Sequence, residues 1–516
     1  MKTENEIREM LHKGESISLE CKSAAGGVPK SLWDSYSAFA NTYGGIILLG
    51  IEEKKGSFTI TGVNNPQTVI SDLWNTLSSE KVSSNILFND SIYTLTIDEH
   101  TIIVIEVPRA ERTERPIFLN KNLYGASFRR NGEGDYHCTR EQIVSMVRDQ
   151  QEQGVDGKII ENMMISELNQ ESIQGYRNIF KLSKPNHVWN KQSDEVFLMK
   201  IGAAGRGADC EIHPTAAGLL FFGDFISIMN EFPNFFLDYR EHLIDDERWS
   251  DRVCSGDATW SGNVFDFYFR IINRLLADVK VPFQLKDGLT RINETPVHKA
   301  IREALANALI HSDYNGRRGI VIEKSFRHIS IKNPGVFRLN LEDAINGGIS
   351  DTRNPRIFNM FNLIDIGERS GCGLCNMYNI WAENKFPKPE LSEEFNPDRT
   401  SLVLDFSISY TTAEEIRGTF SQEPNASTYG QSSRRIFHPN ENVGKKWSTE
   451  KEVVKISKTA KKVLEILLEN PFATAQSISE ELDISSRAIE KNFQKLKQLG
   501  FIQRIGRTKG GHWEVL

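Results

Sequence analysis

The sequence predicts a multidomain protein of mixed α/β and α+β class. The chain has 516 residues, of which 39% are hydrophobic and 25% charged, and this suits three or four globular domains. Helix and strand patterns are clear in residues 1–150, 291–410 and 451–516 and weaker in a connecting α/β region, 151–290. Ser, Thr, Gln, Asn and Gly dominate residues 411–450, so we expect a flexible linker there.

The overall composition excludes several classes of protein. A net charge of −7 argues against a uniformly basic nucleic-acid-binding protein, so any such contact must come from a local patch. Six cysteines in so long a chain are not a disulfide framework, and the Cys372–Cys375 pair lacks the second pair that zinc needs. The N-terminus is charged, and no apolar run approaches the roughly 20 residues of a membrane span. We therefore expect a cytoplasmic protein without membrane contacts.

Helices and strands alternate in the N-terminal domain, residues 1–150. The apolar spacing predicts a helix over 4–13, a strand over 14–22, a helix over 32–40 and, after a Gly44–Gly45 turn, a strand over 46–51. The last of these is continuously apolar, which predicts a strand buried on both faces.

The 14–22 strand, the Ala-Phe-Ala-Asn-Thr-Tyr-Gly-Gly run at 38–45 and the acidic end of the next strand resemble the Schlafen/AlbA-like domain. The resemblance spans most of residues 14–140 and implies a nucleic-acid-binding α/β domain. Some Schlafen members are endoribonucleases for structured RNA that use three acidic residues. The corresponding residues here are Glu15, Glu20 and Glu53.

The Schlafen resemblance implies that these three acids hold a divalent metal ion that activates water. It also implies phosphate contacts from Lys22, Arg129 and Arg130. The third acid is a glutamate where the nucleases carry aspartate, and its extra methylene moves the carboxylate by more than roughly 1 Å, enough to disturb a tight metal site. The alternative is that Glu15 and Glu20 serve as caps or pair with Lys22 and nearby basic residues.

The connecting region, 151–290, shows no catalytic pattern. Residues 213–223 are mostly apolar and predict a strand, and residues 263–277 predict an amphipathic helix. The apolar side of that helix serves either as core or as a dimer face.

A helix with two different faces is predicted over residues 302–314. At 100° per residue, Ile301, Leu305, Ala308 and Leu309 form a buried stripe, and Glu303, Asn307, His311 and Tyr314 line up opposite. Glu303 and Asn307 lie one turn apart. A carboxylate and an amide oxygen so placed suit a hydrated Mg²⁺ ion beside nucleotide phosphates.

Two β-rich runs, 319–323 and 328–332, then predict a hairpin that ends at Asn333-Pro334-Gly335. A Gly371-Cys372-Gly373-Leu374 stretch precedes a helix over 375–381, as in anion sites at helix N-termini. This order of elements, over roughly residues 291–408, resembles the GHKL ATPase fold, an α/β sandwich, in the divergent form of proteins often labelled RecG-related.

The GHKL resemblance implies binding of ATP and Mg²⁺. Glu303 corresponds to the general base and Asn307 to the Mg²⁺ ligand. Asn333 and Gly335 replace a motif whose aspartate accepts the adenine amino group, and a neutral amide is a weaker acceptor. Gly371 and Gly373 correspond to the phosphate-binding glycines, and Arg353, Arg356 and Arg369 lie where the family has a flexible lid.

Three helices over 460–469, 474–482 and 486–499, followed by strands near 500–506 and 512–515, are predicted at the C-terminus. This pattern is similar to a winged helix-turn-helix and covers residues 456–516. The resemblance implies major-groove and phosphate contacts from Arg487, Lys491, Lys495, Arg504, Arg507 and Lys509. The alternative is a winged helix that binds protein.

These expectations favour a nucleic-acid-binding, ATP-binding regulator, transcriptional or defence-related, that binds DNA or RNA. The alternative is a metal-dependent Schlafen-like endoribonuclease acting on tRNA or other structured RNA. A third hypothesis is an interaction scaffold whose sites have decayed. The absence of a Gly-x-x-x-x-Gly-Lys-Ser/Thr loop disfavours a helicase. We also expect a homodimer, because GHKL-type and winged-helix proteins often pair.

Overall fold

The computed structural model describes residues 1–407 apart from 55–56, 152–153, 243–248, 278, 280–284, 287–289, 292–294 and 368–370. Beyond these it describes 462–463, 466–467, 473–482, 484–498, 502–505 and 512–515. The predicted linker 411–450 therefore lies outside the described residues. The chain divides into two compact units, Met1–Tyr429 and Gly430–Leu516. Of the helices in the described ranges, none is long and apolar enough to cross a membrane.

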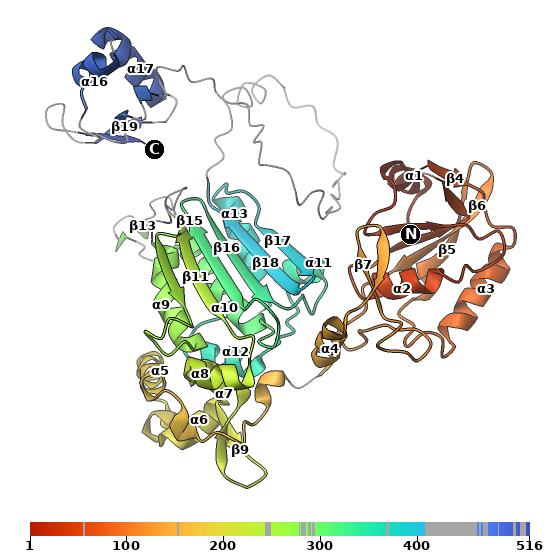
Figure 1. The fold of residues 1–516 in the computed structure, drawn as a ribbon, viewed down its shortest axis with the longest axis horizontal. Helices are drawn as coiled ribbons and strands as arrows, with labels where there is room; N and C mark the ends of the chain where they lie inside the picture. Colours follow the sequence, from red (N-terminus) through yellow and green to blue (C-terminus); the bar gives the residue numbers. More distant parts are fainter. Residues whose placement is uncertain are drawn as a thin grey trace. The chain divides into compact units, whose positions relative to one another are not determined.

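A four-stranded sheet with the order β1-β2-β6-β5 forms the centre of the N-terminal region (Figure 1). Its first pair, β1 and β2, is parallel and the other two pairs are antiparallel. The strands are β1 (Leu19–Lys22), β2 (Gly45–Leu49), β5 (Ile92–Ile97) and β6 (His100–Val107). The 14–22 prediction is thus shortened to β1. The strand predicted over 46–51 ends at Leu49, just before Gly50, whose φ is +92°.

Both faces of this sheet are covered, as predicted for the apolar strand. Ile47 and Leu49 belong to a core shared with α2 (Leu32–Ala40) and α3 (Pro66–Leu77). Ile46 and Leu48 belong to a second core with α1 (Glu4–Lys13). The remaining elements are the hairpins β3–β4 (Ile51–Lys54, Ser57–Ile60) and β7–β8 (Phe128–Asn131, Gly134–His137), and α4 (Arg140–Asp149).

The Ala-Phe-Ala-Asn-Thr-Tyr-Gly-Gly run has a structural role. The buried Asn41 amide donates to the carbonyl oxygens of Ile117 and Phe128 (2.8 and 3.0 Å) and accepts from the Ile117 N–H (2.7 Å). Gly44 has φ of +77°, and a Cβ there would lie 2.8 Å from the Val107 oxygen. Only glycine fits that approach. The run therefore joins the end of α2 to the segments that contain Ile117 and Phe128, and it approaches β6 closely at Val107.

The middle region is mostly helical. Its helices are α5 (Gln170–Ser183), α6 (Asp194–Ile201), α7 (Ala216–Phe222), α8 (Phe225–Glu231) and α9 (Val264–Leu276), and its short hairpin is β9–β10 (Ala204–Arg206, Ile212–Pro214). The strand predicted over 213–223 is wrong. Thr215 caps a helix there by accepting the Gly218 N–H, and the fully buried apolar run showed neither period. The amphipathic helix is confirmed as α9, and its apolar side lies in the core.

A six-stranded sheet with the order β12-β11-β15-β16-β18-β17 dominates the region that follows (Figure 1). The predicted hairpin is confirmed as β15 (Ile320–Ser325) and β16 (His328–Pro334). The other strands are β11 (Leu237–His242), β12 (Asp251–Cys254), β17 (Glu390–Phe395) and β18 (Asp398–Asp405). Since β11 pairs with β15, the boundary drawn at residue 290 does not separate two cores.

The helices α10 (Pro296–His311), α11 (Leu341–Asn346), α12 (Pro355–Leu363) and α13 (Gly373–Glu383) belong to the same region. One hydrophobic cluster runs from Ile160 through α9 and α10 to Leu404. Residues 285–286 and 290–291 form the short pair β13–β14.

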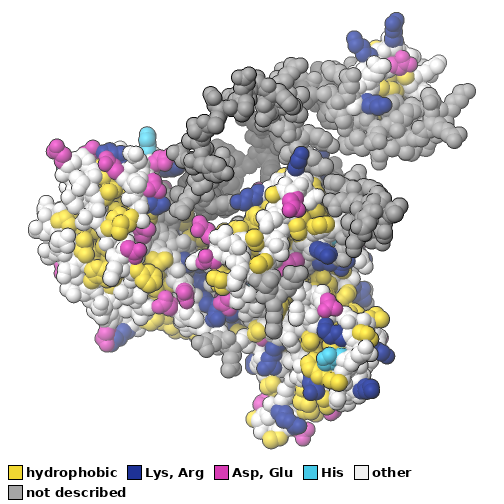
Figure 2. Space-filling model, turned by 180° about the vertical axis from the view of Figure 1, so that it is seen from behind, with side chains coloured by type: hydrophobic (Ala, Val, Ile, Leu, Met, Phe, Trp, Pro, Cys, Tyr) yellow, Lys and Arg dark blue, Asp and Glu magenta, His cyan; other side chains and the backbone are white. Residues whose placement is uncertain are grey.

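In the C-terminal unit the structure describes α16 (Ala475–Leu482), α17 (Ser486–Gln498), β19 (Ile502–Ile505) and β20 (His512–Val515). Val463, Ile478, Ile489, Phe493 and Leu496 form its core. Two helices followed by an antiparallel pair agree with the last four elements of the predicted winged helix. Most of the helix predicted over 460–469 lies outside the described residues. Lys and Arg side chains lie at the surface of this unit (Figure 2).

Candidate functional site

One cavity brings together five of the six residues that the sequence analysis assigned to nucleotide binding; Gly335 is not among its lining residues. Glu303 and Asn307 of α10, Asn333 at the end of β16, and Gly371 and Gly373 before and in α13 all line it. Its free volume of about 150 Å³ is roughly ten times what one water molecule requires. Residues as far apart in the sequence as Glu303 and Leu402 thus line one pocket.

The α10 helix presents its polar face to this pocket. Its first turn is capped by Thr295, whose hydroxyl accepts the His298 N–H, while Ile301 and Leu305 are fully buried on the other face. The Asn307 amide donates to Glu303 Oε1 at 3.1 Å. Because its N–H is used in this way, the amide oxygen is the group that Asn307 offers to a cation.

The other two residues predicted on the polar face, His311 and Tyr314, differ in whether they face the pocket. His311 lines the pocket, and burial, with a contribution from the nearby Arg353 charge, lowers its pKa to about 4, so the ring is neutral at pH 7. Tyr314 is not on this face. It lies beyond the end of α10, where the helical angle no longer applies, and its buried hydroxyl donates to the Leu309 carbonyl.

The two glycines of the predicted phosphate loop approach the pocket differently. A Cβ on Gly373 would lie 2.7 Å from Glu303 Oε1 and 3.3 Å from Asn307 Nδ2. Gly371 has φ of +66°, and its Cβ would meet the Ile349 backbone at 3.0 Å. Gly373 is therefore glycine to leave room at the polar face of α10, whereas Gly371 is glycine for its backbone conformation.

Asn333 is buried and donates only a long hydrogen bond, 3.4 Å, to the Pro334 carbonyl. Gly335 has φ of +96°, and a Cβ there would lie 2.3 Å from Arg353 Nη1. Its carbonyl accepts from Thr400 Oγ1 at 2.8 Å. Gly335 thus makes room for the buried Arg353, a contact that no local motif predicts.

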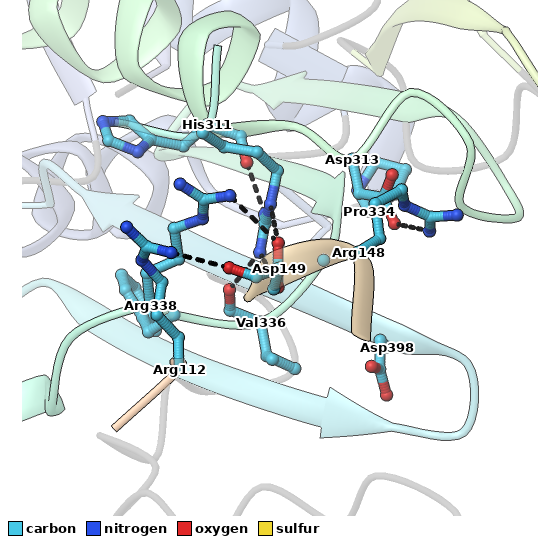
Figure 3. Close-up of polar contacts among 12 residues, drawn as sticks. Arg112, Arg148, Asp149, His311, Asp313, Pro334, Val336, Arg338 and Asp398 are labelled. Atoms are coloured by element: carbon cyan, nitrogen blue, oxygen red, sulfur yellow. Dashed lines mark hydrogen bonds and ion pairs between the residues drawn. The ribbon is translucent and has the colours of Figure 1, made fainter. Parts of the chain in front are cut away.

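Arginines gather around Asp149, the last residue of α4, beside the pocket (Figure 3). Arg353 binds both of its carboxylate oxygens, at 3.0 and 2.8 Å, and Arg338 contacts one of them at 3.3 Å. Although burial raises the pKa of Asp149, these two charges outweigh it and hold the pKa at about 2.

The predicted lid is wrong at Arg353, because its side chain is only 6% exposed and its position is fixed by Asp149. Arg356 lies in the first turn of α12, with its side chain beside Gly157 and Gly202. Arg369 lies outside the described residues. Arg338 and Asp351 line the pocket but were missed, since no local motif marks them.

The three acids of the predicted nuclease site lie near one another; Glu15 and Glu20 already have partners, whereas Glu53 is exposed. Burial raises the pKa of Glu15, and the charges of Glu20 and Glu53 raise it further, while its carboxylate accepts the Cys21 N–H at 2.8 Å. Glu20 pairs with Lys22 at 2.7 Å and with Arg130 at 2.8 Å. Over the described ranges, no group of three or more His, Cys, Asp or Glu residues is arranged to hold a metal ion. The alternative of pairing with basic residues is confirmed for Glu20.

The two arginines expected to hold phosphate are buried. Arg129 pairs with Asp398 at 2.5 Å with 5% of its side chain exposed. Burial lowers the pKa of Arg129, but Asp398 more than offsets this and raises it overall. Arg130 is 1% exposed and bonds Asp135 and the carbonyls of Ser16 and Leu19. This placement does not favour direct phosphate contacts.

In the C-terminal unit, Arg487 and Lys491 are exposed on α17, as expected for a recognition helix. Lys495 lies on the same helix and Arg504 in β19, with side chains outside the described part. Arg507 and Lys509 also lie outside the described residues.

Comparison with solved structures gave matches of low similarity. The DIP2311 protein from Corynebacterium diphtheriae is 16% identical over 99% of this chain and 96% of its own, with a TM-score of 0.39. The N-terminal domain of a "putative ATP-dependent DNA helicase RecG-related protein" from Nitrosomonas europaea is 28% identical over 27% of this chain and 95% of its own, with a TM-score of 0.22. No curated protein matches the chain.

Comparison with protein families gave four matches along the chain. Residues 15–139 match the family "Schlafen, AlbA_2", and residues 144–238 match a domain of unknown function. Residues 318–403 match "Putative ATP-dependent DNA helicase recG C-terminal", and residues 456–503 match "Winged helix-turn-helix DNA-binding". The chain therefore contains, in this order, segments similar to the Schlafen/AlbA_2, RecG C-terminal and winged helix-turn-helix families.

Proposed function

We propose that this protein is a nucleic-acid-binding regulator that binds ATP with Mg²⁺ in the pocket between α10, β16 and α13. The observation that carries the nucleotide part is the pocket itself, which collects Glu303, Asn307, Asn333, Gly371 and Gly373. The nucleic-acid part is supported by the Schlafen/AlbA_2 and winged-helix matches.

The chemistry of the pocket suits a magnesium–nucleotide complex. The Asn307 amide oxygen is of the type that Mg²⁺ accepts, and the Glu303 carboxylate lies one turn away on the same helix. Bound Mg²⁺ would neutralise phosphate charge. The α13 N-terminus adds backbone N–H groups, which favour an anion.

Calorimetric titration of the full chain with ATP and Mg²⁺ tests this proposal. We expect binding by wild type and a loss of at least tenfold in Asn307→Ala, because the cation ligand is removed. Lys299→Ala is the matched control, since Lys299 is exposed on the same helix. Absent binding, or equal binding in wild type and Asn307→Ala, would remove the nucleotide part.

The nucleic-acid part has a separate test. Binding of duplex DNA should weaken on deletion of residues 451–516, and ATP should change that affinity if the pocket has a regulatory role. DNA affinity that is the same without the C-terminal unit would contradict a DNA-binding winged helix.

A metal-dependent endoribonuclease is the second candidate. Its one favourable observation is the proximity of Glu15, Glu20 and Glu53, whose charges interact. It predicts cleavage of tRNA with Mg²⁺ or Mn²⁺ that is lost in Glu20→Gln. Glu52→Gln is the control, since Glu52 is more exposed and pairs with Lys54. Intact RNA after incubation with wild type would exclude this function.

A further inference from the structure

Arg338 is a buried pocket residue whose charge is poorly matched by its surroundings. Only 4% of its side chain is exposed, and it lines the pocket. Its hydrogen bonds reach Asp149 and Asp351 at 3.3 Å and the Thr352 carbonyl at 3.1 Å, and its Nε has no partner. Bonds between arginine and carboxylate are normally about 2.7–2.9 Å, so both contacts with carboxylates are long.

The neighbouring Arg353 is held by shorter hydrogen bonds than Arg338. It holds Asp149 through two bonds of 3.0 and 2.8 Å. It also donates to the carbonyls of His311 and Val336 at 2.6 and 2.9 Å. Both arginines bond to Asp149, but Arg353 makes the shorter bonds. Arg338 is therefore the member of the pair that can change partner at small cost.

The electrostatics agree with this difference. Burial lowers the pKa of Arg338, and the charge of Arg353 lowers it further, whereas Asp149 and Asp351 raise it. The net direction is downward, which means that the buried positive charge is incompletely compensated. An anion with several oxygens would complete its hydrogen bonds, since the guanidinium fork matches phosphate geometry.

We propose that Arg338 binds a phosphate group of the pocket's ligand, and that it releases Asp149 to do so. The proposal rests on nucleotide binding at this pocket. The exchange of partners by Arg338 also affects the N-terminal region, because Asp149 is the last residue of α4. Ligand phosphate and α4 compete for one guanidinium, so occupancy of the pocket weakens one of the ties that hold α4 to it.

Titration of full-length Arg338→Gln with three probes tests the phosphate contact. We expect ATP and inorganic triphosphate to bind roughly tenfold or more weakly, as for the loss of charged hydrogen bonds, and adenosine to bind as it does to wild type. A purely structural role for Arg338 would weaken all three probes equally and overturn the proposal. If Arg338→Gln fails to fold, Arg338→Lys keeps the charge without the fork, and the same selective loss, severalfold, is expected.

Asp149→Asn tests the exchange of partners. Removing the competing carboxylate should tighten ATP binding severalfold. Arg148→Gln is the matched control, because Arg148 ties the same helix to Asp313 at 2.5 Å without lining the pocket, and its ATP affinity should equal that of wild type. Unchanged or weaker ATP binding in Asp149→Asn, or an equal gain in Arg148→Gln, would overturn the exchange. If wild type and Arg338→Gln bind ATP equally while Asn307→Ala does not bind, this inference alone fails. If wild type binds none of the three probes, nucleotide binding itself fails.

Discussion

Replacing Gly373 by alanine should damage the site without damaging the fold. The new Cβ would lie 2.7 Å from Glu303 Oε1, where ordinary contact begins at 3.4 Å. The atom that must yield is the end of a flexible side chain, so the carboxylate moves by about 0.7 Å. A shift on the order of 1 Å at a functional group can cost up to roughly a hundredfold in activity. Stability should change little, because alanine in place of glycine favours a helix by about 0.5–1 kcal/mol.

Gly371→Ala is the matched comparison, two residues away. There the φ of +66° disfavours alanine, and the Cβ would meet the Ile349 backbone at 3.0 Å. The left-handed conformation alone costs about 1–2 kcal/mol, which lowers Tm by a few degrees in a protein of this size. The two substitutions should therefore separate, with lost stability at residue 371 and lost function at residue 373.

Thermal unfolding and titration with ATP and Mg²⁺, performed on both variants and wild type, measure the two effects. We expect Gly373→Ala to keep the wild-type Tm within about a degree and to bind ATP at least tenfold more weakly. An equal fall in Tm for both variants, or wild-type ATP binding by Gly373→Ala, would refute the reasoning.

Three further predictions concern stability and DNA binding. Burial raises the pKa of Asp156 to about 6, so the folded state holds this proton more tightly than the unfolded state. The free energy of unfolding of wild type should therefore fall by roughly 3 kcal/mol as pH rises from about 4 to 6. Urea unfolding of Asp156→Asn should lack this pH dependence. Asp398→Ala leaves the buried Arg129 charge without its partner and should lower the free energy of unfolding by about 3–5 kcal/mol. Asp398→Leu combined with Arg129→Met should lower it by less in the same assay, and equal losses would contradict this. Arg487 and Lys491 are exposed on α17. Replacing both by alanine should weaken DNA binding and lower the slope of log affinity against log salt concentration by about two. An unchanged slope would exclude phosphate contacts from these two residues.

Much of the local structure follows from the sequence because it depends on neighbours along the chain. The helix that carries Glu303 and Asn307 shows helical spacing with a capped start, and the β15–β16 hairpin shows strand runs ending at Pro334-Gly335. The strand prediction for residues 213–223 was wrong because a fully buried run carries no periodicity. The helix there depends on the Thr215 cap and on burial on all sides.

Motif spacing and periodicity are local properties, so the order of amino acids alone predicts the three recognisable segments and the residue types of the pocket. Which of those residues meet, and which charges already have partners, depends on the folded chain. The tertiary structure placed Arg129 and Arg130 in buried ion pairs rather than at a surface, and it set Asp149 against Arg338 and Arg353, about 200 residues away. Such pairings depend on desolvation and on distances through space, and the order of amino acids along the chain does not encode these directly.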